Sequence, residues 1–252
     1  MRGCLACSAL HPPYIPHTTI VSGEPKIYQF GGKIYGFVLQ VRYMRLPPLD
    51  ILPHNRTGLV RAARIVSNIA SPPSLFAAAG FVIALVEYPS LEGFLLAAIY
   101  GTLASLLPIL YVVYLLKTNR ISDLHMSDLR ERRIPYLIGL IGAGFALWAV
   151  YNKAGPSLLT ALILCHIIAM LTLTILNTYW LVSAHVATAT ALMTFAGFAF
   201  GYTRSLLLLP LVGIIFYVRW FLKRHTMGEL VSGLFVGTGT VLLLATIGVF
   251  TR

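Results

Sequence analysis

A histidine and a carboxylate stand four residues apart near the C-terminal end of the chain. His225 and Glu229 lie between two apolar segments, and Arg219 stands six residues before the histidine. Side chains four residues apart share one face of a helix, so Glu229 can hold the His225 imidazole. Charged groups beside a membrane-spanning segment are costly to place, which makes this group a functional-site hypothesis. A histidine held in this way can act as a nucleophile or as a general base.

The composition of the chain is that of a membrane protein. Of its 252 residues, 58% are hydrophobic and only 11% are charged, which is not the profile of a soluble domain. The predicted fold class is all-α, a polytopic transmembrane helix bundle of about six to seven spans with a short polar N-terminal extension. The apolar segments, each near the ~20 residues that a helix needs to cross hydrocarbon, are 65–87, 93–116, 135–151, 156–179, 184–201, 205–221 and 229–250.

The N-terminal extension comprises residues 1–63 and is polar and rich in proline. Within it, two short aromatic runs flank Gly31-Gly32, which predicts a β-hairpin over residues 26–41 because paired glycines supply the positive φ of a tight turn. Two alternatives stay open: an extension without regular structure, or a true start at Met44. Residues 64–252 are expected to form one transmembrane domain.

The distribution of basic residues predicts the orientation of the bundle. The formal net charge is +11. With seven spans, the N-terminus shares a membrane face with loops 117–134, 180–184 and 219–228, and this face holds sixteen Lys and Arg against three on the other. The positive-inside rule places the basic face in the cytoplasm. Nucleic acid is not an expected partner, because no basic stripe with interleaved aromatic residues is present.

Three polar patches stand at the ends of the apolar segments. They are the loop 117–135, the start of the fifth segment at Ser183–His185, and the stretch from Arg219 to Glu229. Two spans separate the first patch from the second, and two separate the second from the third. An even number of crossings returns a chain to the same membrane face, so the three patches can converge whichever orientation is correct.

The order and spacing of these patches resembles the type 2 phosphatidic acid phosphatase and haloperoxidase superfamily over about residues 65–245. Its signatures are Lys-x6-Arg-Pro, Pro-Ser-Gly-His and Ser-Arg-x5-His-x3-Asp. The third appears here as Val218-Arg219-x5-His225-x3-Glu229, and the second as Val182-Ser183-Ala184-His185. The end of the first is matched by Arg133-Ile134-Pro135, with Met126 where the lysine should be. The other departures are the valines before Arg219 and Ser183, Ala184 for glycine, and Glu229 for aspartate.

The resemblance implies hydrolysis of a lipid phosphate or diphosphate, such as phosphatidate or a prenyl diphosphate, without a metal or other cofactor. His225 would attack phosphorus and form a phosphohistidine, Glu229 would orient it, and His185 would protonate the leaving alkoxide. The phosphoryl oxygens would be bound by cationic and hydroxyl side chains: Arg219, Ser183, Arg133, and Lys117 or Arg120 in place of the missing lysine. Many members of the superfamily act on the outer face, but the distribution of basic residues here places the active site on the cytoplasmic face of the cell membrane.

Two other functions stay open. A catalytically inactive homologue that binds or transports phospho-lipids is compatible with the incomplete first motif. An intramembrane prenyltransferase would hold diphosphate through magnesium between two aspartate-rich loops, whereas this sequence has one such cluster, Asp123 and Asp128. Arg219 and His225 could also form a basic cluster that anchors helices to lipid headgroups.

Several other residues have a structural explanation. His166, in the middle of the fourth segment, is predicted to be a buried, hydrogen-bonded core histidine, and Gly233 and Gly237 are predicted to let helices pack closely. Cys4-x-x-Cys7 is too weak a pattern to predict a zinc site. The expected partners are the lipid substrate and membrane lipids, with a homo-oligomer left open.

Overall fold

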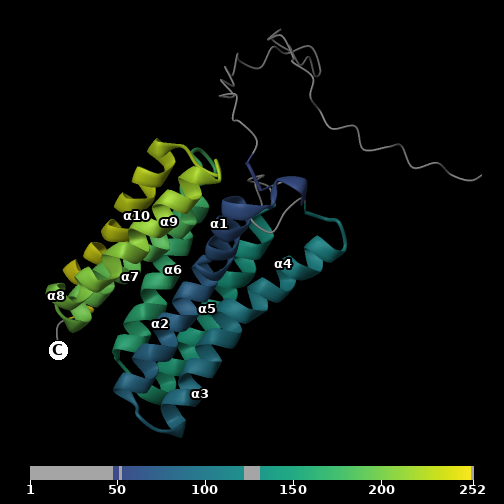
Figure 1. Cartoon of the computed structure of the whole chain (residues 1–252). Coiled ribbons are helices and arrows are strands. Elements are labelled where there is room, and N and C mark those ends of the chain that lie inside the picture. The colour runs from purple at the N-terminus through teal and green to yellow at the C-terminus, as the bar shows by residue number, and fades with distance from the viewer. Residues whose placement is uncertain (1–47, 51–52, 122–130, 251–252) are drawn as a thin grey trace, which may run out of the picture. The chain divides into compact units, whose positions relative to one another are not determined.

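The computed structural model describes residues 48–50, 53–121 and 131–250, and within these ranges the chain is all-helical (Figure 1). This confirms the predicted fold class. The hairpin predicted over residues 26–41 lies outside the described residues. The predicted boundary between residues 63 and 64 falls inside the first helix, α1 (Gly58–Ile69).

The described part of the chain contains five helical segments that are long and apolar enough to cross a membrane. A sixth is counted if α1 and α2 (Pro72–Glu87) form one bent span, and α7 (Ala184–Phe200) is a shorter apolar helix. Each of the seven predicted segments overlaps one of these helical segments, so the chain is a membrane-embedded, multi-pass protein. The five are α3 with α4 (Leu91–Tyr100 and Leu107–Lys117), α5 (Arg133–Ala154), α6 (Leu158–Leu176), α8 with α9 (Tyr202–Ser205 and Leu209–Phe221) and α10 (Met227–Thr246).

The first apolar segment forms two helices rather than one straight span. Helix α1 ends at Ile69, α2 begins at Pro72, and the two axes differ by 51°. Ser71 between them has extended backbone angles, as the residue before a proline prefers, and proline is well suited to the first turn of α2. The bend leaves Ser67, in the last turn of α1, buried in the bundle.

Helix α3 continues into α4 through a π-helical turn, Gly101–Leu106. Pro108 follows in the first turn of α4, where its missing N–H is tolerated. Helix α5 packs directly against the turn, because a Cβ at Gly142 would touch the Leu103 carbonyl. Single π-helical turns are frequent at functional sites, and here Pro108 borders a cavity described below.

Helices α7 and α10 pack closely through glycine. A Cβ at Gly233 would lie 2.9 Å from the Ser183 carbonyl oxygen, and one at Gly237 would touch the carbonyl of Ala187. This confirms that both glycines let the two helices approach. The backbone N–H of Ser183 also donates to the Glu229 carbonyl at 3.2 Å, so the first turns of α7 and α10 lie side by side.

Helix α6 is anchored at its N-terminus by a carboxylate from α2. Glu87 accepts hydrogen bonds from the backbone N–H groups of Leu158 at 2.8 Å and Leu159 at 3.0 Å. Ser157 and Thr160 add a capping box. A carboxylate at a helix N-terminus satisfies amide groups that have no partner in the helix and complements its dipole. The contact fixes α6 against α2 at the end remote from the three polar patches.

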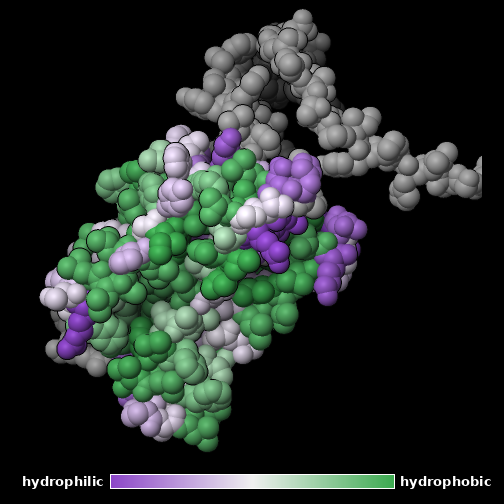
Figure 2. Space-filling model, viewed as in Figure 1, coloured by the Kyte–Doolittle hydropathy of each residue, from purple (hydrophilic) through white to green (hydrophobic). Residues whose placement is uncertain are grey.

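The flank of the bundle is hydrophobic. Figure 2 shows hydrophobic residues over most of it, with hydrophilic residues gathered mainly near the ends of α1 and α4. Large apolar side chains such as Phe81, Phe145 and Phe235 are exposed. Such a continuous apolar surface is a liability in water, and it suits contact with lipid chains.

Candidate functional site

Side chains from the three polar patches line one cavity of about 260 Å³. Arg132 immediately precedes α5, His185 lies in the first turn of α7, Arg219 lies near the end of α9, and His225 precedes α10. Each of the four is less than a tenth exposed. The structure therefore brings the patches together, as the even number of crossings predicts.

Glu229 holds His225 from behind the cavity. Nδ1 of His225 lies 3.1 Å from Oε2 of Glu229, and the two side chains are 2% and 3% exposed. The same carboxylate accepts the backbone N–H of Thr226, while the Thr226 hydroxyl accepts the N–H of Glu229. This capping box starts α10. Because Nδ1 is bound to the carboxylate, Nε2 is the ring nitrogen directed away from it.

Ser67 in α1 links the other histidine to an arginine. Nε2 of His185 lies 3.2 Å from the Ser67 carbonyl oxygen, and Nη1 of Arg219 donates to the Ser67 hydroxyl at 3.0 Å. A carbonyl oxygen only accepts, so Nε2 of His185 carries the hydrogen. Ser67 was not predicted as a site residue. The only sequence signal for it is Ser71-Pro72-Pro73, which interrupts an apolar segment just after it.

Arg132, rather than the predicted Arg133, reaches the cavity. Arg132 is 7% exposed and lines it, whereas Arg133 is exposed and does not. Pro135 and Tyr136 also line it, and residues three and four positions after Arg132 fall on the same side of a helix. Successive residues are turned by about 100°, which directs Arg133 elsewhere. The prediction that Arg133 faces the site is therefore wrong.

The other predicted phosphate ligands lie away from the cavity. Lys117 and Arg120 are exposed, and neither is among the lining residues. Ser183 is fully buried beneath the start of α7 and is also not among them. Of the phosphate ligands predicted from the sequence, the described structure brings Arg219 to the cavity together with the two histidines.

A buried ion pair fixes the loop that carries His225. Asp50 is completely buried and accepts two hydrogen bonds of 2.9 Å from Nε and Nη2 of Arg224. Arg64 contacts the same carboxylate at 3.4 Å. Two parallel bonds between a guanidinium and a carboxylate define the geometry of both groups. Asp50 was not predicted as a site residue, because no motif or periodic pattern surrounds it in the sequence.

The deeper part of the cavity is mostly apolar. Its walls include Pro108 and Val112 from α4 and Ala169 and Met170 from α6, and His166 also borders it. His166 is 3% exposed and its Nδ1 lies 3.0 Å from the Tyr100 hydroxyl. This confirms the prediction of a buried, hydrogen-bonded histidine, while its position on the cavity was not predicted.

Within the described ranges, no group of three His, Cys, Asp or Glu side chains is placed to hold a metal ion. The aspartates of the magnesium alternative, Asp123 and Asp128, lie outside those ranges. The same is true of Cys4 and Cys7.

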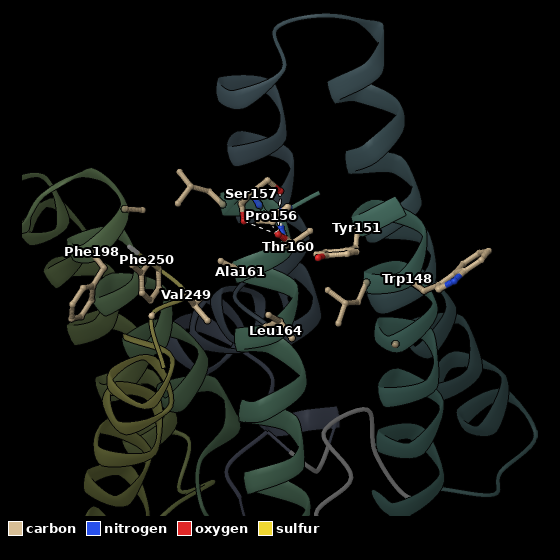
Figure 3. Close-up of a pocket in the computed structure, with 15 residues that line it drawn as sticks. Trp148, Tyr151, Pro156, Ser157, Thr160, Ala161, Leu164, Phe198, Val249 and Phe250 are labelled. Carbon is tan, nitrogen blue, oxygen red and sulfur yellow. Dashed lines mark hydrogen bonds between the residues drawn. The ribbon is translucent and has the colours of Figure 1, made fainter. Parts of the chain in front are cut away.

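A second cavity, of about 720 Å³, lies at the opposite end of the bundle (Figure 3). Trp148 and Tyr151 border it from α5, and Phe198, Val249 and Phe250 border it from the other side. Among the described residues that line it there is no histidine, acidic or basic side chain. It is larger than the first cavity, yet it offers no group for phosphoryl transfer.

Comparisons with protein-family models, with curated proteins and with solved structures found no match. The chemistry of the first cavity therefore has to be inferred from its own side chains. Two guanidinium groups supply forked hydrogen-bond donors that fit the oxygens of a phosphate. The two imidazoles can supply a nucleophile and a proton donor.

Proposed function

We propose that the protein is an integral-membrane phosphatase that hydrolyses a lipid phosphate or diphosphate in the first cavity. The observation that carries the proposal is one cavity whose lining includes four buried side chains: a histidine held on a carboxylate, a second histidine and two arginines. This is also the arrangement expected from the resemblance to the type 2 phosphatidic acid phosphatase and haloperoxidase superfamily. Arg132 takes the place predicted for Arg133.

The proposed reaction has two steps. In the first, Nε2 of His225 attacks phosphorus, the bond from phosphorus to the lipid oxygen breaks, and protonated His185 gives its proton to the leaving alkoxide. In the second, His185 takes a proton from a water molecule that attacks phosphorus, the bond to His225 breaks, and phosphate leaves. Glu229 stabilises the positive charge on His225, as a triad carboxylate does. Arg132 and Arg219 hold the non-bridging oxygens and the charge that develops on them.

The apolar walls support a lipid as the substrate. Pro108, Val112 and Met170 continue the cavity away from the arginines into the interior of a membrane-embedded bundle. A ligand that suits such a site has an anionic group at one end and a hydrocarbon part at the other. Phosphatidate and prenyl diphosphates both have this form.

We also propose that the site faces the cytoplasm in the cell membrane, because the basic residues gather on its side of the bundle. Asn152 and Lys223 are both exposed and stand at opposite ends of the bundle. A cysteine at Asn152 should react with an impermeant thiol reagent on intact cells, and a cysteine at Lys223 should not. The reverse pattern would place the site outside.

A second candidate function is binding of a phospho-lipid without hydrolysis. The observation that favours it is the position of Lys117 and Arg120, which are exposed and do not line the cavity. In the described structure the cavity thus has two arginines and lacks the third cation that the resemblance implies. Weaker stabilisation of the transition-state charge would lower turnover more than binding.

The test is phosphate release from a panel of lipid phosphates by the purified protein in detergent, with a chelator present. Wild-type protein should release phosphate, and His225→Ala should abolish release because the nucleophile is lost. The exposed His54 provides a matched control, and His54→Ala should retain full activity. Full activity of His225→Ala would refute the mechanism. Stabilisation by lipid phosphates without release from any of them would favour the second function.

A further inference from the structure

His166 presents a polar atom deep in the apolar part of the cavity. It lies in the middle of α6 and is 3% exposed. One face of its ring stacks on Phe76, with the ring centroids 4.1 Å apart. An ionisable side chain at this depth is expensive to bury and marks a functional position by default.

The contact with Tyr100 determines which ring nitrogen carries the hydrogen. The Tyr100 side chain is completely buried, and its hydroxyl lies 3.0 Å from Nδ1 of His166. A buried hydroxyl proton requires an acceptor, and in the described part of the chain this nitrogen is the acceptor beside it. Tyr100 therefore donates to Nδ1, and Nε2 of His166 carries the hydrogen.

His166 borders the cavity, and we infer from its neighbours that the Nε2 edge of the ring is turned toward it. Tyr100, which contacts Nδ1, is not among the lining residues, whereas His166 and Phe76 are. Nε2 makes no hydrogen bond to any residue that the structure describes. A hydrogen-bond donor thus faces a cavity whose neighbouring walls, Ala169 and Met170, are apolar.

Helix α6 runs from this donor toward the arginine end of the cavity. Leu173 packs in one cluster with Tyr136 and Ala184, which stand near Arg132 and beside His185 in the sequence. His166 and Leu173 share one face of α6 and both line the cavity, and their separation of seven residues spans about 10 Å along the helix axis. In an extended acyl-glycerol phosphate, the ester carbonyl oxygen lies about 8 Å from phosphorus at ordinary bond lengths. A phosphate held near Arg219 and His225 can therefore place that carbonyl close to His166.

We propose that His166 is a specificity-determining residue that donates its Nε2 hydrogen to an ester carbonyl of the substrate. This rests on the proposed function and selects between its two substrate classes. An acyl-glycerol phosphate has an acceptor at the required depth. An oligoprenyl phosphate has only hydrocarbon there and leaves the buried donor without a partner, which costs binding free energy.

The test compares two probes of similar length, dodecanoyl-glycerol phosphate and tetradecyl phosphate, which has no oxygen on its chain. Binding is measured as ligand-dependent stabilisation of the purified His225→Ala protein in detergent. The acyl probe should bind about tenfold more tightly, in line with one hydrogen bond to a buried donor. Adding His166→Leu should bring the ratio close to one. Cys165→Ala is the control, because Cys165 is the neighbouring buried residue and does not line the cavity. Adding Cys165→Ala should leave the roughly tenfold preference unchanged.

Equal binding of the two probes, or a preference that persists in His166→Leu, would overturn the proposal. If His166→Leu does not fold, two other variants replace it. His166→Gln should keep part of the preference for the acyl probe, because its amide still donates a hydrogen bond. A preference that is fully kept in His166→Phe, which has no donor, would count against the proposal. Phosphate release from the same probes is measured separately with wild-type protein. The binding comparison does not depend on hydrolysis, because the His225→Ala variant lacks the nucleophile. Absence of phosphate release from wild-type protein would therefore count against the phosphatase proposal alone, and absence of the acyl preference in binding would count against the specificity proposal alone.

Discussion

Replacing Glu229 by glutamine separates the charge of this side chain from its structural role. Glutamine at the third position of α10 can still accept the Thr226 N–H and complete the capping box. It removes the negative charge that stabilises protonated His225. The contact is a buried, charge-assisted hydrogen bond of 3.1 Å, a type that contributes about 1.5–3 kcal/mol. At about 1.4 kcal/mol per factor of ten, Glu229→Gln should lower kcat about 10- to 150-fold.

The assay is phosphate release at saturating lipid phosphate, together with the Tm of the protein in detergent. Glu229→Gln should lose activity with little change in Tm. Glu229→Ala should lose activity and also have a lower Tm, because removal of the side chain also breaks the capping box, at a cost of about 0.5–2 kcal/mol. Wild-type kcat in Glu229→Gln would refute the idea that the carboxylate charge supports a catalytic His225.

Two further predictions concern the arginine end of the cavity and its anchor. Arg132→Gln should lower kcat/KM about 10- to 150-fold, because it removes a charge-assisted contact with phosphate. Arg133 is exposed, and Arg133→Gln should keep kcat/KM within about twofold of the wild-type value. Equal effects of the two changes would show that Arg132 is not a phosphate ligand. Asp50→Asn should destabilise the protein by about 3–5 kcal/mol, because it removes the charge that compensates buried Arg224, and this is measured as a lower Tm in detergent. Arg61 is exposed, and Arg61→Gln is the control, which should change stability by less than about 0.5 kcal/mol. If Asp50→Asn and Arg61→Gln have a similar Tm, the ion pair does not stabilise the fold as argued.

Hydropathy is a sufficient guide to the helices of this chain. Backbone polar groups in hydrocarbon must be satisfied internally, so an apolar segment of sufficient length is forced to be helical. The same reasoning does not determine whether a segment is straight. Residues 65–87 have the length of one span, yet Pro72 ends one helix and starts another. The break can be read from Ser71-Pro72-Pro73, but its angle depends on how the bundle packs.

The contact between His225 and Glu229 was predicted from their spacing, but it forms for a different reason. The prediction assumed one face of a helix, whereas His225 lies before the first residue of α10. Glu229 reaches back to the loop because it is the third residue of α10 and completes a capping box with Thr226. A carboxylate in this role points toward residues before the helix. The spacing of four is therefore compatible with either geometry.

Arg132 and Asp50 lie beyond what the sequence could predict. Three arginines within four residues, Arg130, Arg132 and Arg133, precede Pro135, and which of them faces inward depends on the helical phase at the start of α5. One residue of difference turns a side chain by about 100°. Asp50 stands alone between prolines and apolar residues, and its partner Arg224 is distant in the sequence. Only the folded chain brings them together.

The contacts of Leu49 and Asp50 make the segment before the first apolar stretch part of the site. Asp50 binds Arg224, the residue immediately before His225, and Leu49 donates its N–H to the Leu222 carbonyl in the same loop at 3.1 Å. A bundle that began at residue 64 would keep both histidines and Arg219 but would lose these contacts. Arg224 would then be a buried cation without its carboxylate, an expensive state that the loop could relieve only by moving. Because that loop sets the position of His225, the functional unit has to include Asp50.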